Sequence, residues 1–167
     1  MSVGAAVSYG LVPGVGAGVT VGGDLAITGR FRLGVRWLMF PATRAEAAGT
    51  AIELGLSAGS VALCFEALRG RVAALGGCGG VVLGVITPSV LQGEARGAGQ
   101  QFWAAVTVQP RLRVQLVGPL AAELGVDVVA PLVRHVFFVG GGMAPVTAFQ
   151  QTPVAVAGTF GLAMHFR

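Results

Sequence analysis

The residues that could do chemistry in this chain are few, and most are charged side chains in apolar surroundings. The chain has 11 arginines, no lysine, seven acidic residues and two histidines, His135 and His165. Its only cysteines are Cys64 and Cys78, and neither histidine lies near them in the sequence. A structural metal site needs about four such ligands at close spacing. We therefore predict no metal site and no cofactor.

A catalytic arrangement is equally hard to assemble from these residues. Nucleophilic catalysis needs a base within hydrogen-bond reach of the nucleophile. His135 and Ser89 fall in two different predicted connections, and no acidic residue is placed to orient the histidine. His165 lies in the last predicted strand, at the opposite end. We predict no catalytic residue and no enzyme, and keep a lipid-modifying enzyme as an alternative.

The two cysteines fit either one disulfide or two buried thiols, and the sequence leaves both open. They flank the short connection "EALRGR" at 66–71. If this turn centres near Leu68, the cysteines lie several positions out of register. A disulfide would then require a longer, irregular connection.

The arginines are spread through apolar segments rather than gathered in one run. In the stretch "RFRLGVRWLMF", three arginines alternate with large apolar residues. Sites that bind nucleic acid are typically continuous basic patches or faces. Because the net charge of +4 is scattered along the chain, we predict no nucleic-acid partner.

The overall composition indicates a membrane protein. Hydrophobic residues make up 54% of the chain, and charged residues only 11%, against about 25% in ordinary soluble domains. The mean hydropathy is +0.78. The most apolar stretches, 72–91 and 114–133, are poor transmembrane helices because both contain glycine and proline and the second carries two acidic residues. Strands are therefore the better way for this sequence to cross a bilayer.

Four segments alternate with a period of two residues. Residues 30–39, 102–116, 120–132 and 154–166 each place large apolar side chains on one face and small or polar side chains on the other. They are about 10–14 residues long, whereas strands of soluble proteins are mostly about 5–6. An apolar face toward lipid and a crowded interior would explain both the alternation and the low charge.

Turn signals divide the chain into eight predicted strands joined by alternating short and long connections. Tight turns are expected at 21–24 and 117–120, and a long loop at 134–153. Bacterial transmembrane barrels have even strand numbers and this alternation of connections. We predict an all-β fold with one domain over 1–167, a closed antiparallel up-and-down transmembrane β-barrel of eight strands. The predicted strands are 2–11, 13–22, 27–40, 50–65, 70–86, 101–116, 119–133 and 153–166.

The strand register predicts ion pairs inside the barrel. The tight turn at 117–120 sets Arg113 opposite Glu123 on the inner face, and a loop centred near residue 45 would bring Arg36 near Glu53. Opposite charges across a strand pair are favourable. We expect these pairs to fill the interior, because an eight-stranded barrel is just wide enough for side chains. The predicted lumen network is Arg30, Arg32, Arg36, Glu53, Arg111, Arg113, Glu123 and Asp127.

With these segments in place, the chain resembles the small eight-stranded outer-membrane β-barrel proteins of bacteria. The resemblance covers about residues 13–167 and rests on "GRFRLGVRWLMF", "QFWAAVTVQPRLRVQL", "LAAELGVDVVAPLV" and "VAVAGTFGLAMHFR". The last segment resembles that family's C-terminal assembly signal, except that Arg167 follows the aromatic Phe166. The resemblance implies the bacterial outer membrane as location, with its lipids and the barrel-assembly machinery as partners. Residues 1–12 show no secretory signal.

Aromatic side chains are expected on the lipid-facing surface and at the rim. Trp37 and Phe40 end one predicted strand, beside a long connection. Phe102 and Trp103 begin another at the same rim. Aromatics at this position form an interfacial girdle in membrane barrels. The predicted lipid-facing and girdle residues are Phe31, Trp37, Phe40, Phe102, Phe160 and Phe166.

These expectations favour an integral outer-membrane barrel with a structural, envelope-maintenance or adhesion role and a lumen filled by side chains. The resemblance is to an architecture, so it implies no single activity. A narrow anion-preferring channel is a further alternative, because five of the predicted interior residues are arginines. The loop at 134–153 would be external, with a partner that the sequence does not identify.

Overall fold

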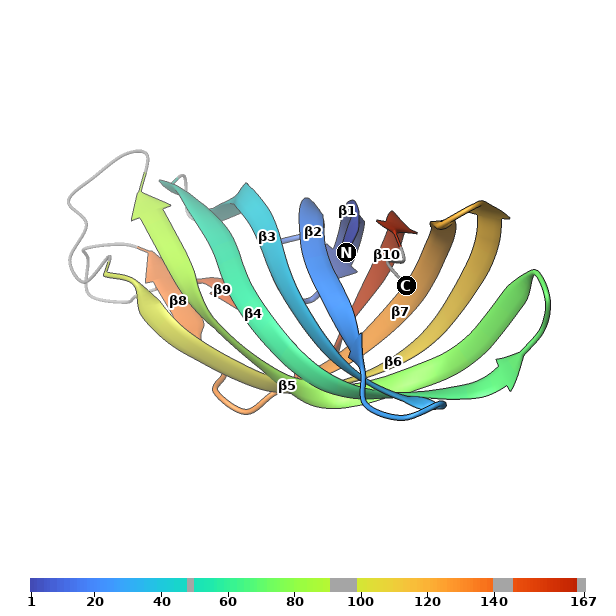
Figure 1. Ribbon diagram of the computed structural model, residues 1–167. Helices are drawn as coiled ribbons and strands as arrows, with labels where there is room; N and C mark the ends of the chain where they lie inside the picture. The colour runs from blue at the N-terminus through green and yellow to red at the C-terminus, as the bar shows by residue number, and fades with distance from the viewer. Residues whose placement is uncertain (48–49, 91–98, 140–145, 165–167) are drawn as a thin grey trace.

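The computed structural model describes residues 1–47, 50–90, 99–139 and 146–164, which form mostly long strands (Figure 1). A short hairpin is made by β8 (Val136–Val139) and β9 (Val146–Gln150). None of the described residues lies in a helix long and apolar enough to cross a membrane. The eight wall strands are β1 (Ser2–Tyr9), β2 (Val15–Ala26), β3 (Phe31–Ala47), β4 (Thr50–Arg69), β5 (Ala73–Val90), β6 (Gln101–Val117), β7 (Leu120–Pro131) and β10 (Ala155–Met164).

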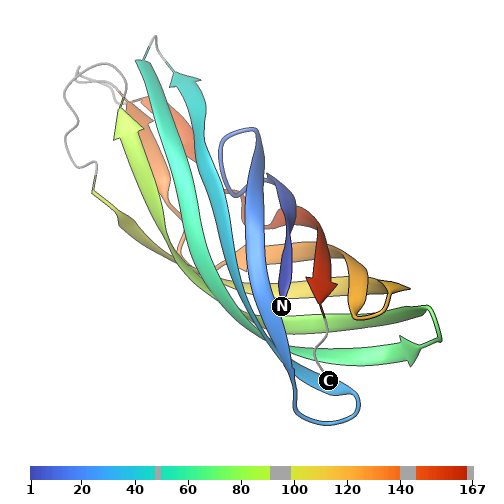
Figure 2. The ribbon, with the colours of Figure 1, turned by 45° about the horizontal axis from the view of Figure 1, so that its top comes forward.

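The wall strands close into an antiparallel barrel in the order β1-β10-β7-β6-β5-β4-β3-β2. This confirms the predicted closed eight-stranded fold. The turns at 27–30, 70–72 and 118–119 lie at one end, which we call the turn end. The N-terminus lies there beside β10 (Figure 2), and the Met1 amino group donates to the Met164 carbonyl (3.0 Å). The opposite end, which holds the other connections, is the loop end.

The period-two pattern of the sequence decides which residues face outward and which face the lumen. Arg32 and Arg36 occupy the inner positions of β3 and are only partly exposed. A one-residue shift would exchange the two faces, so the apolar pattern sets the register strongly. The outward side chains of β3, each 36–56% exposed, are Phe31, Leu33, Val35, Trp37 and Met39.

The barrel wall is much taller on one side than on the other. β1 has 8 residues and β4 has 20, so at about 3.3 Å per residue they span about 26 and 66 Å. A tilted strand needs only about 9–11 residues to cross a bilayer. The long strands β3, β4 and β5 therefore extend past the short seam of β1 and β10 toward the hairpin of β8 and β9 (Figure 1).

The tight turn predicted at 21–24 is wrong, because β2 continues through these residues and the chain turns at 27–30 instead. Gly22 pairs with Arg36 across the strands. A Cβ on Gly22 would lie 2.7 Å from the carbonyl oxygen of Val35, so only glycine fits this close approach. Gly22 therefore marks close packing of strands rather than a turn, whereas a Cβ on Gly23 would meet no atom within 4 Å.

The connection predicted between the strands 27–40 and 50–65 is mostly strand. β3 and β4 stay paired up to Ala47 and Thr50, with an extra residue accommodated between Phe40 and Thr43. Such a bulge bends the strand while pairing continues beyond it. The predicted loop at 134–153 likewise contains structure, because Phe137 pairs with Phe149 in the hairpin of β8 and β9.

Candidate functional site in the barrel lumen

The loop half of the lumen is an apolar core. The hairpin of β8 and β9 contributes Phe137, which is 8% exposed and packs in one cluster with the buried residues of the barrel wall. Phe149 of the hairpin packs against it, with ring centroids 6.4 Å apart. This end of the barrel is therefore filled by apolar packing. The main wall residues of the core, each 1–5% exposed, are Phe40, Leu54, Leu56, Ile86, Trp103 and Val129.

Two aromatics expected at the rim belong to this core instead. The prediction that Phe40 joins the girdle is wrong, because its even-numbered position follows the inner face of β3 that Arg36 also occupies; Phe40 is 1% exposed. Trp103 is 1% exposed for the same reason, since odd positions of β6 face inward.

The other aromatic residues of the predicted outer surface are exposed, apart from one that the structure does not describe. Phe31, Trp37, Phe102 and Phe160 are 41%, 56%, 59% and 60% exposed, and all lie on the outer face of their strands. Phe166 lies outside the described residues. The outer face therefore carries four of the six predicted aromatics.

His135 holds the connection that follows β7 against the barrel. Its Nε2 lies 2.8 Å from the carbonyl oxygen of Phe102, and its backbone N–H donates to Oε1 of Gln151 (3.2 Å). Gln151, 1% exposed, donates in turn to the carbonyl of Leu11 (3.4 Å). In the part of the chain that the structure covers, no hydrogen bond joins His135 to Ser89. These contacts anchor a loop and do not build a nucleophile and its base.

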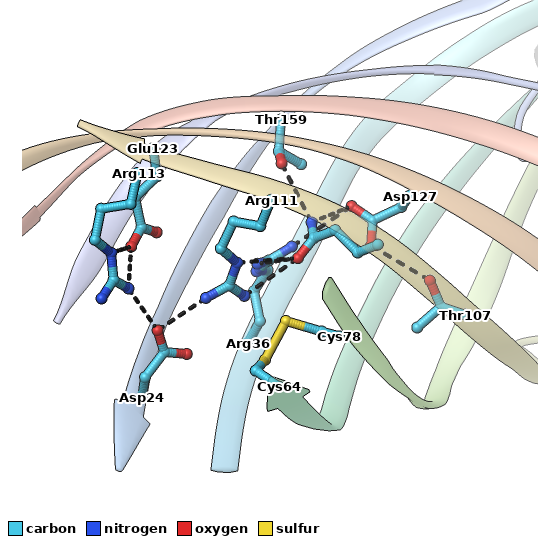
Figure 3. The surroundings of a disulfide bond; sticks show 11 residues. Asp24, Arg36, Cys64, Cys78, Thr107, Arg111, Arg113, Glu123, Asp127 and Thr159 are labelled. Carbon is cyan, nitrogen blue, oxygen red and sulfur yellow. Dashed lines mark hydrogen bonds and ion pairs between the residues drawn. A yellow bond between two sulfur atoms is a disulfide. The ribbon is translucent and has the colours of Figure 1, made fainter. Parts of the chain in front are cut away.

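The turn half of the lumen is held by ion pairs (Figure 3). Asp24 is the centre of one group: its Oδ2 accepts from Arg111 Nη1 and from Arg113 Nη2, both at 2.8 Å. Arg113 also pairs with Glu123, its directly opposite neighbour on β7. Asp24 thus joins β2 to β6 across the lumen, and Glu123 extends the group to β7.

Gln109 links this group to a second one. Its side-chain oxygen accepts from Arg36 Nη2 (2.9 Å) and Arg111 Nε (3.3 Å), and its amide nitrogen donates to Asp127 Oδ2 (2.7 Å). Arg36 Nη1 lies 3.5 Å from the same carboxylate. Thr107 Oγ1 donates to the other oxygen of Asp127 at 3.3 Å. Gln109 is 2% exposed, so its polar atoms depend on these partners.

The charges of this inner network balance one another. Buried charges are tolerable only when they are paired and hydrogen-bonded. Three arginines here face three carboxylates, every arginine lies within 3.5 Å of a carboxylate, and all six side chains are only 12–18% exposed. The six side chains of this inner network are Arg36, Arg111, Arg113, Asp24, Glu123 and Asp127.

Some residues of the predicted network lie elsewhere. The prediction that Arg36 meets Glu53 is wrong, because β3 and β4 remain paired past residue 45 and this register sets Arg36 opposite Ser60. Glu53 instead pairs with Arg44 (3.6 Å) on the outward face of β4. Arg30 is exposed in the turn before β3.

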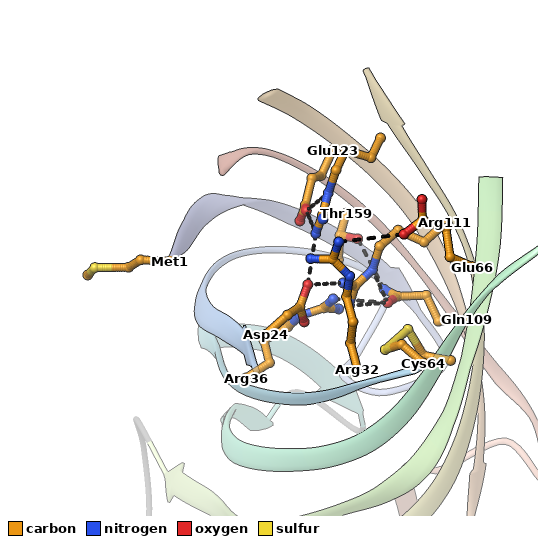
Figure 4. Close-up of polar contacts among 12 residues, drawn as sticks. Met1, Asp24, Arg32, Arg36, Cys64, Glu66, Gln109, Arg111, Glu123 and Thr159 are labelled. Atoms are coloured by element: carbon orange, nitrogen blue, oxygen red, sulfur yellow. Dashed lines mark hydrogen bonds and ion pairs between the residues drawn. A yellow bond between two sulfur atoms is a disulfide. The ribbon is translucent and has the colours of Figure 1, made fainter. Parts of the chain in front are cut away.

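Sequence reasoning missed two carboxylates of the turn half. The turn predicted at 21–24 includes Asp24, but Asp24 lies on β2 and faces inward like Gly22, two positions before it. This alternation is the signal that could have found it. The short connection predicted at 66–71 includes Glu66, which lies instead on β4. There it pairs with Arg32 (3.5 Å; Figure 4) and with Arg69.

A disulfide joins Cys64 on β4 to Cys78 on β5 (Figures 3 and 4). The two residues pair directly across the strands, with Cα atoms 3.9 Å apart. They come into register because the turn lies at 70–72 rather than at Leu68. Of the two possibilities that the sequence leaves open, a disulfide or two buried thiols, the structure has the disulfide. Both are at most 7% exposed and line a small cavity of about 40 Å³ together with Arg32.

No group of three His, Cys, Asp or Glu residues that could hold a metal ion exists among residues 1–47, 50–90, 99–139 and 146–164. Among the described residues, the polar chemistry of the lumen consists of arginines, carboxylates, amides, hydroxyls and one disulfide. Such a set can bind and orient charged groups and can fill space.

The architecture is similar to that of solved outer-membrane proteins. The attachment invasion locus protein Ail of Yersinia pestis, in complex with the heparin analogue sucrose octasulfate, matches with a TM-score of 0.60 at 11% identity, over 99% of this chain and 95% of that one. A major outer membrane protein from Thermus thermophilus matches with a TM-score of 0.60 at 14% identity, over 99% of each chain. Neisserial surface protein A matches with a TM-score of 0.56 at 12% identity, over 99% and 94%.

No protein-family model and no curated protein sequence matches the chain. The structural matches are therefore evidence of architecture alone. The fold is that of the small eight-stranded outer-membrane β-barrels.

Proposed function

We propose that this protein is an integral protein of the bacterial outer membrane, with a structural, envelope-maintenance or adhesion role and a lumen that does not conduct ions. The observation that carries this proposal is a lumen filled by side chains beneath an apolar exterior. Its surrounding lipids and, through its C-terminal strand, the barrel-assembly machinery are the partners that we propose.

The exterior of the barrel supports insertion into a bilayer. All eight wall strands expose large apolar side chains, among them Val3 at 58%, Val108 at 63% and Phe160 at 60%. Soluble monomers rarely expose contiguous apolar patches larger than a few hundred Å². Lipid would solvate this surface, as it does the apolar band of other transmembrane barrels.

The filled lumen argues against the anion channel. In the loop half, Phe40, Leu54 and Trp103 are each 1% exposed, so no open path surrounds them. In the inner network of the turn half, the three arginines that could attract anions are held by three carboxylates. An eight-stranded barrel has little interior space beyond what its own side chains occupy.

The lipid-modifying enzyme has less support than the structural role. The Nε2 atom of His135 lies at hydrogen-bond distance from the Phe102 carbonyl, where it holds a loop. General-base catalysis would need that nitrogen beside a nucleophile.

The hairpin of β8 and β9 is the surface that we propose for an adhesion role. Its outward side chains include Val136, Phe138 and Val146, which are 40%, 59% and 43% exposed at the loop end. The loop end faces outside the cell in transmembrane barrels, where the longer connections lie. Partner binding should therefore be sought with variants of this hairpin.

The membrane part of this proposal is tested by refolding the protein into detergent and comparing gel migration with and without boiling. A closed barrel should migrate differently when it is left unboiled. Full extraction of the native protein into buffer without detergent would contradict membrane insertion.

The closed lumen is tested by reconstituting the refolded protein into planar bilayers. No conductance steps above baseline are expected, whereas an open porin measured in the same bilayer serves as the positive control. Steady single-channel steps from the refolded barrel would overturn the non-conducting lumen and favour the channel.

A further inference from the structure

The turn end of the barrel is open, unlike the loop half. A cavity of about 940 Å³ lies at this mouth, bordered by the turns at 70–72 and 118–119. Small-molecule sites in proteins have volumes of about 300–1,000 Å³. The mouth is therefore large enough for a ligand. Its polar lining side chains are Arg32, Glu66, Arg69, Arg71, Arg113 and Gln115.

Positive charge collects at this mouth. The inner network above it is balanced, so the remaining charge comes from the rim. Arg32, Arg69 and Arg71 line the cavity there beside one carboxylate, Glu66, which pairs with Arg32 and Arg69 and not with Arg71. Arg30, exposed in the neighbouring turn, adds a further positive charge. A concave surface with charge of one sign concentrates ligands of the opposite sign.

Two guanidinium groups at the mouth make no hydrogen bond within the described residues. Arg69 differs from them, since its Nε and Nη2 donate to both oxygens of Glu66 (2.5 and 2.7 Å) and Nη2 also donates to the carbonyl of Gly29 (3.1 Å). Arg32 reaches Glu66 only at 3.5 Å, beyond the usual hydrogen-bond distance. Within the described ranges, Arg71 makes neither a hydrogen bond nor an ion pair. Both groups line the cavity.

We propose that the turn-end mouth binds a phosphate-bearing anion. The planar guanidinium offers two parallel N–H donors that match the oxygens of a phosphate group. Arg32 and Arg71 supply these donors, and Glu66 holds Arg69 in place beside them. Because the lumen above is filled, the mouth is a binding site rather than the entrance to a channel. The phosphate belongs either to a soluble compound or to the head group of a membrane lipid at the rim.

The experiment uses the refolded full chain in a maltoside detergent at low ionic strength. In one arm, calorimetry measures binding of inorganic pyrophosphate. In the other, native mass spectrometry counts phosphatidylglycerol molecules retained, with phosphatidylcholine as the uncharged comparison. The test variant is Arg32→Gln with Arg71→Gln. The matched control is Arg44→Gln with Arg134→Gln, which removes the same charge at the loop end.

The test variant should weaken binding by about tenfold or more, because charge-assisted contacts are the strong ones, and the control should stay within about twofold of wild type. Loss in the pyrophosphate arm identifies a soluble ligand, and loss in the lipid arm alone identifies a head group. Arg71→Gln alone replaces an exposed side chain, so it keeps the test valid if the double variant does not fold. Absence of binding in both arms, or equal loss in test and control variants, overturns the proposal.

Discussion

The loop half and the turn half of the lumen are filled by different interactions. Apolar side chains such as Leu54 and Trp103, each 1% exposed, fill the loop half. Ion pairs centred on Asp24 and Gln109 fill the turn half. The difference follows access to water, because the hairpin of β8 and β9 covers the loop half, whereas the turn half opens into a mouth.

This difference shows that one narrow lumen can be filled in two ways, and that the two fillings respond differently to substitutions. An apolar core loses dispersion contacts when a side chain is shortened. An ion-pair network loses balance when one member is removed, since its partner remains buried and charged. Substitutions in the two halves should therefore differ in size and in how they can be compensated.

The largest effect is expected for Trp103→Ala in the loop half. The Trp103 indole N–H is buried without a hydrogen-bond partner in the described structure, so the loss is one of packing, about 3–5 kcal/mol of unfolding free energy. Urea unfolding in lipid vesicles measures it. Trp37→Ala on the outer face is the control, and an equal loss there would contradict a special role of the loop-half core.

A smaller but compensable effect is expected for Asp24→Asn in the turn half. The change leaves Arg111 and Arg113 without their shared carboxylate, at a cost of about 3 kcal/mol. Adding Arg111→Gln should recover part of that loss, because it restores the charge balance. The same unfolding measurement gives the double-mutant cycle. Strict additivity of the two substitutions would show that they do not act through one network.

The smallest effect is expected for Glu53→Gln on the outer face. Its partner Arg44 has a side chain that is 58% exposed and the two groups lie 3.6 Å apart, and exposed pairs contribute less than about 1 kcal/mol. The unfolding free energy should therefore hardly change. A loss as large as that of Asp24→Asn would mean that position inside the lumen is not what distinguishes the turn-half pairs.

Local alternation made part of this architecture predictable. The period of two residues assigned Arg36, Arg111 and Arg113 to the inner face, because successive side chains of a strand point to opposite sides. The tight turn at 117–120 then set Arg113 opposite Glu123. These inferences needed only residues close in sequence.

The remaining contacts depend on where turns and bulges occur, and that is set by packing between strands. The turn predicted at 21–24 conceals the inward position of Asp24, although the close approach of Gly22 to β3 is what requires glycine there. Glu53 was misplaced because the bulge after Phe40 and the added length of β3 shift the register. The hairpin of β8 and β9 was missed because its strands are only 4 and 5 residues long.

The disulfide has a consequence for the order of assembly. Cys64 and Cys78 are 14 residues apart and oppose each other in one hairpin, so β4 and β5 alone suffice to bring them together. Hairpins form within about 1–10 μs, far faster than thiol oxidation, and an oxidising compartment then supplies the bond. The two longest strands of the barrel can thus be covalently linked before the barrel closes. A linked pair cannot shift its register, so every later strand pairs with an edge whose inner and outer faces are already fixed.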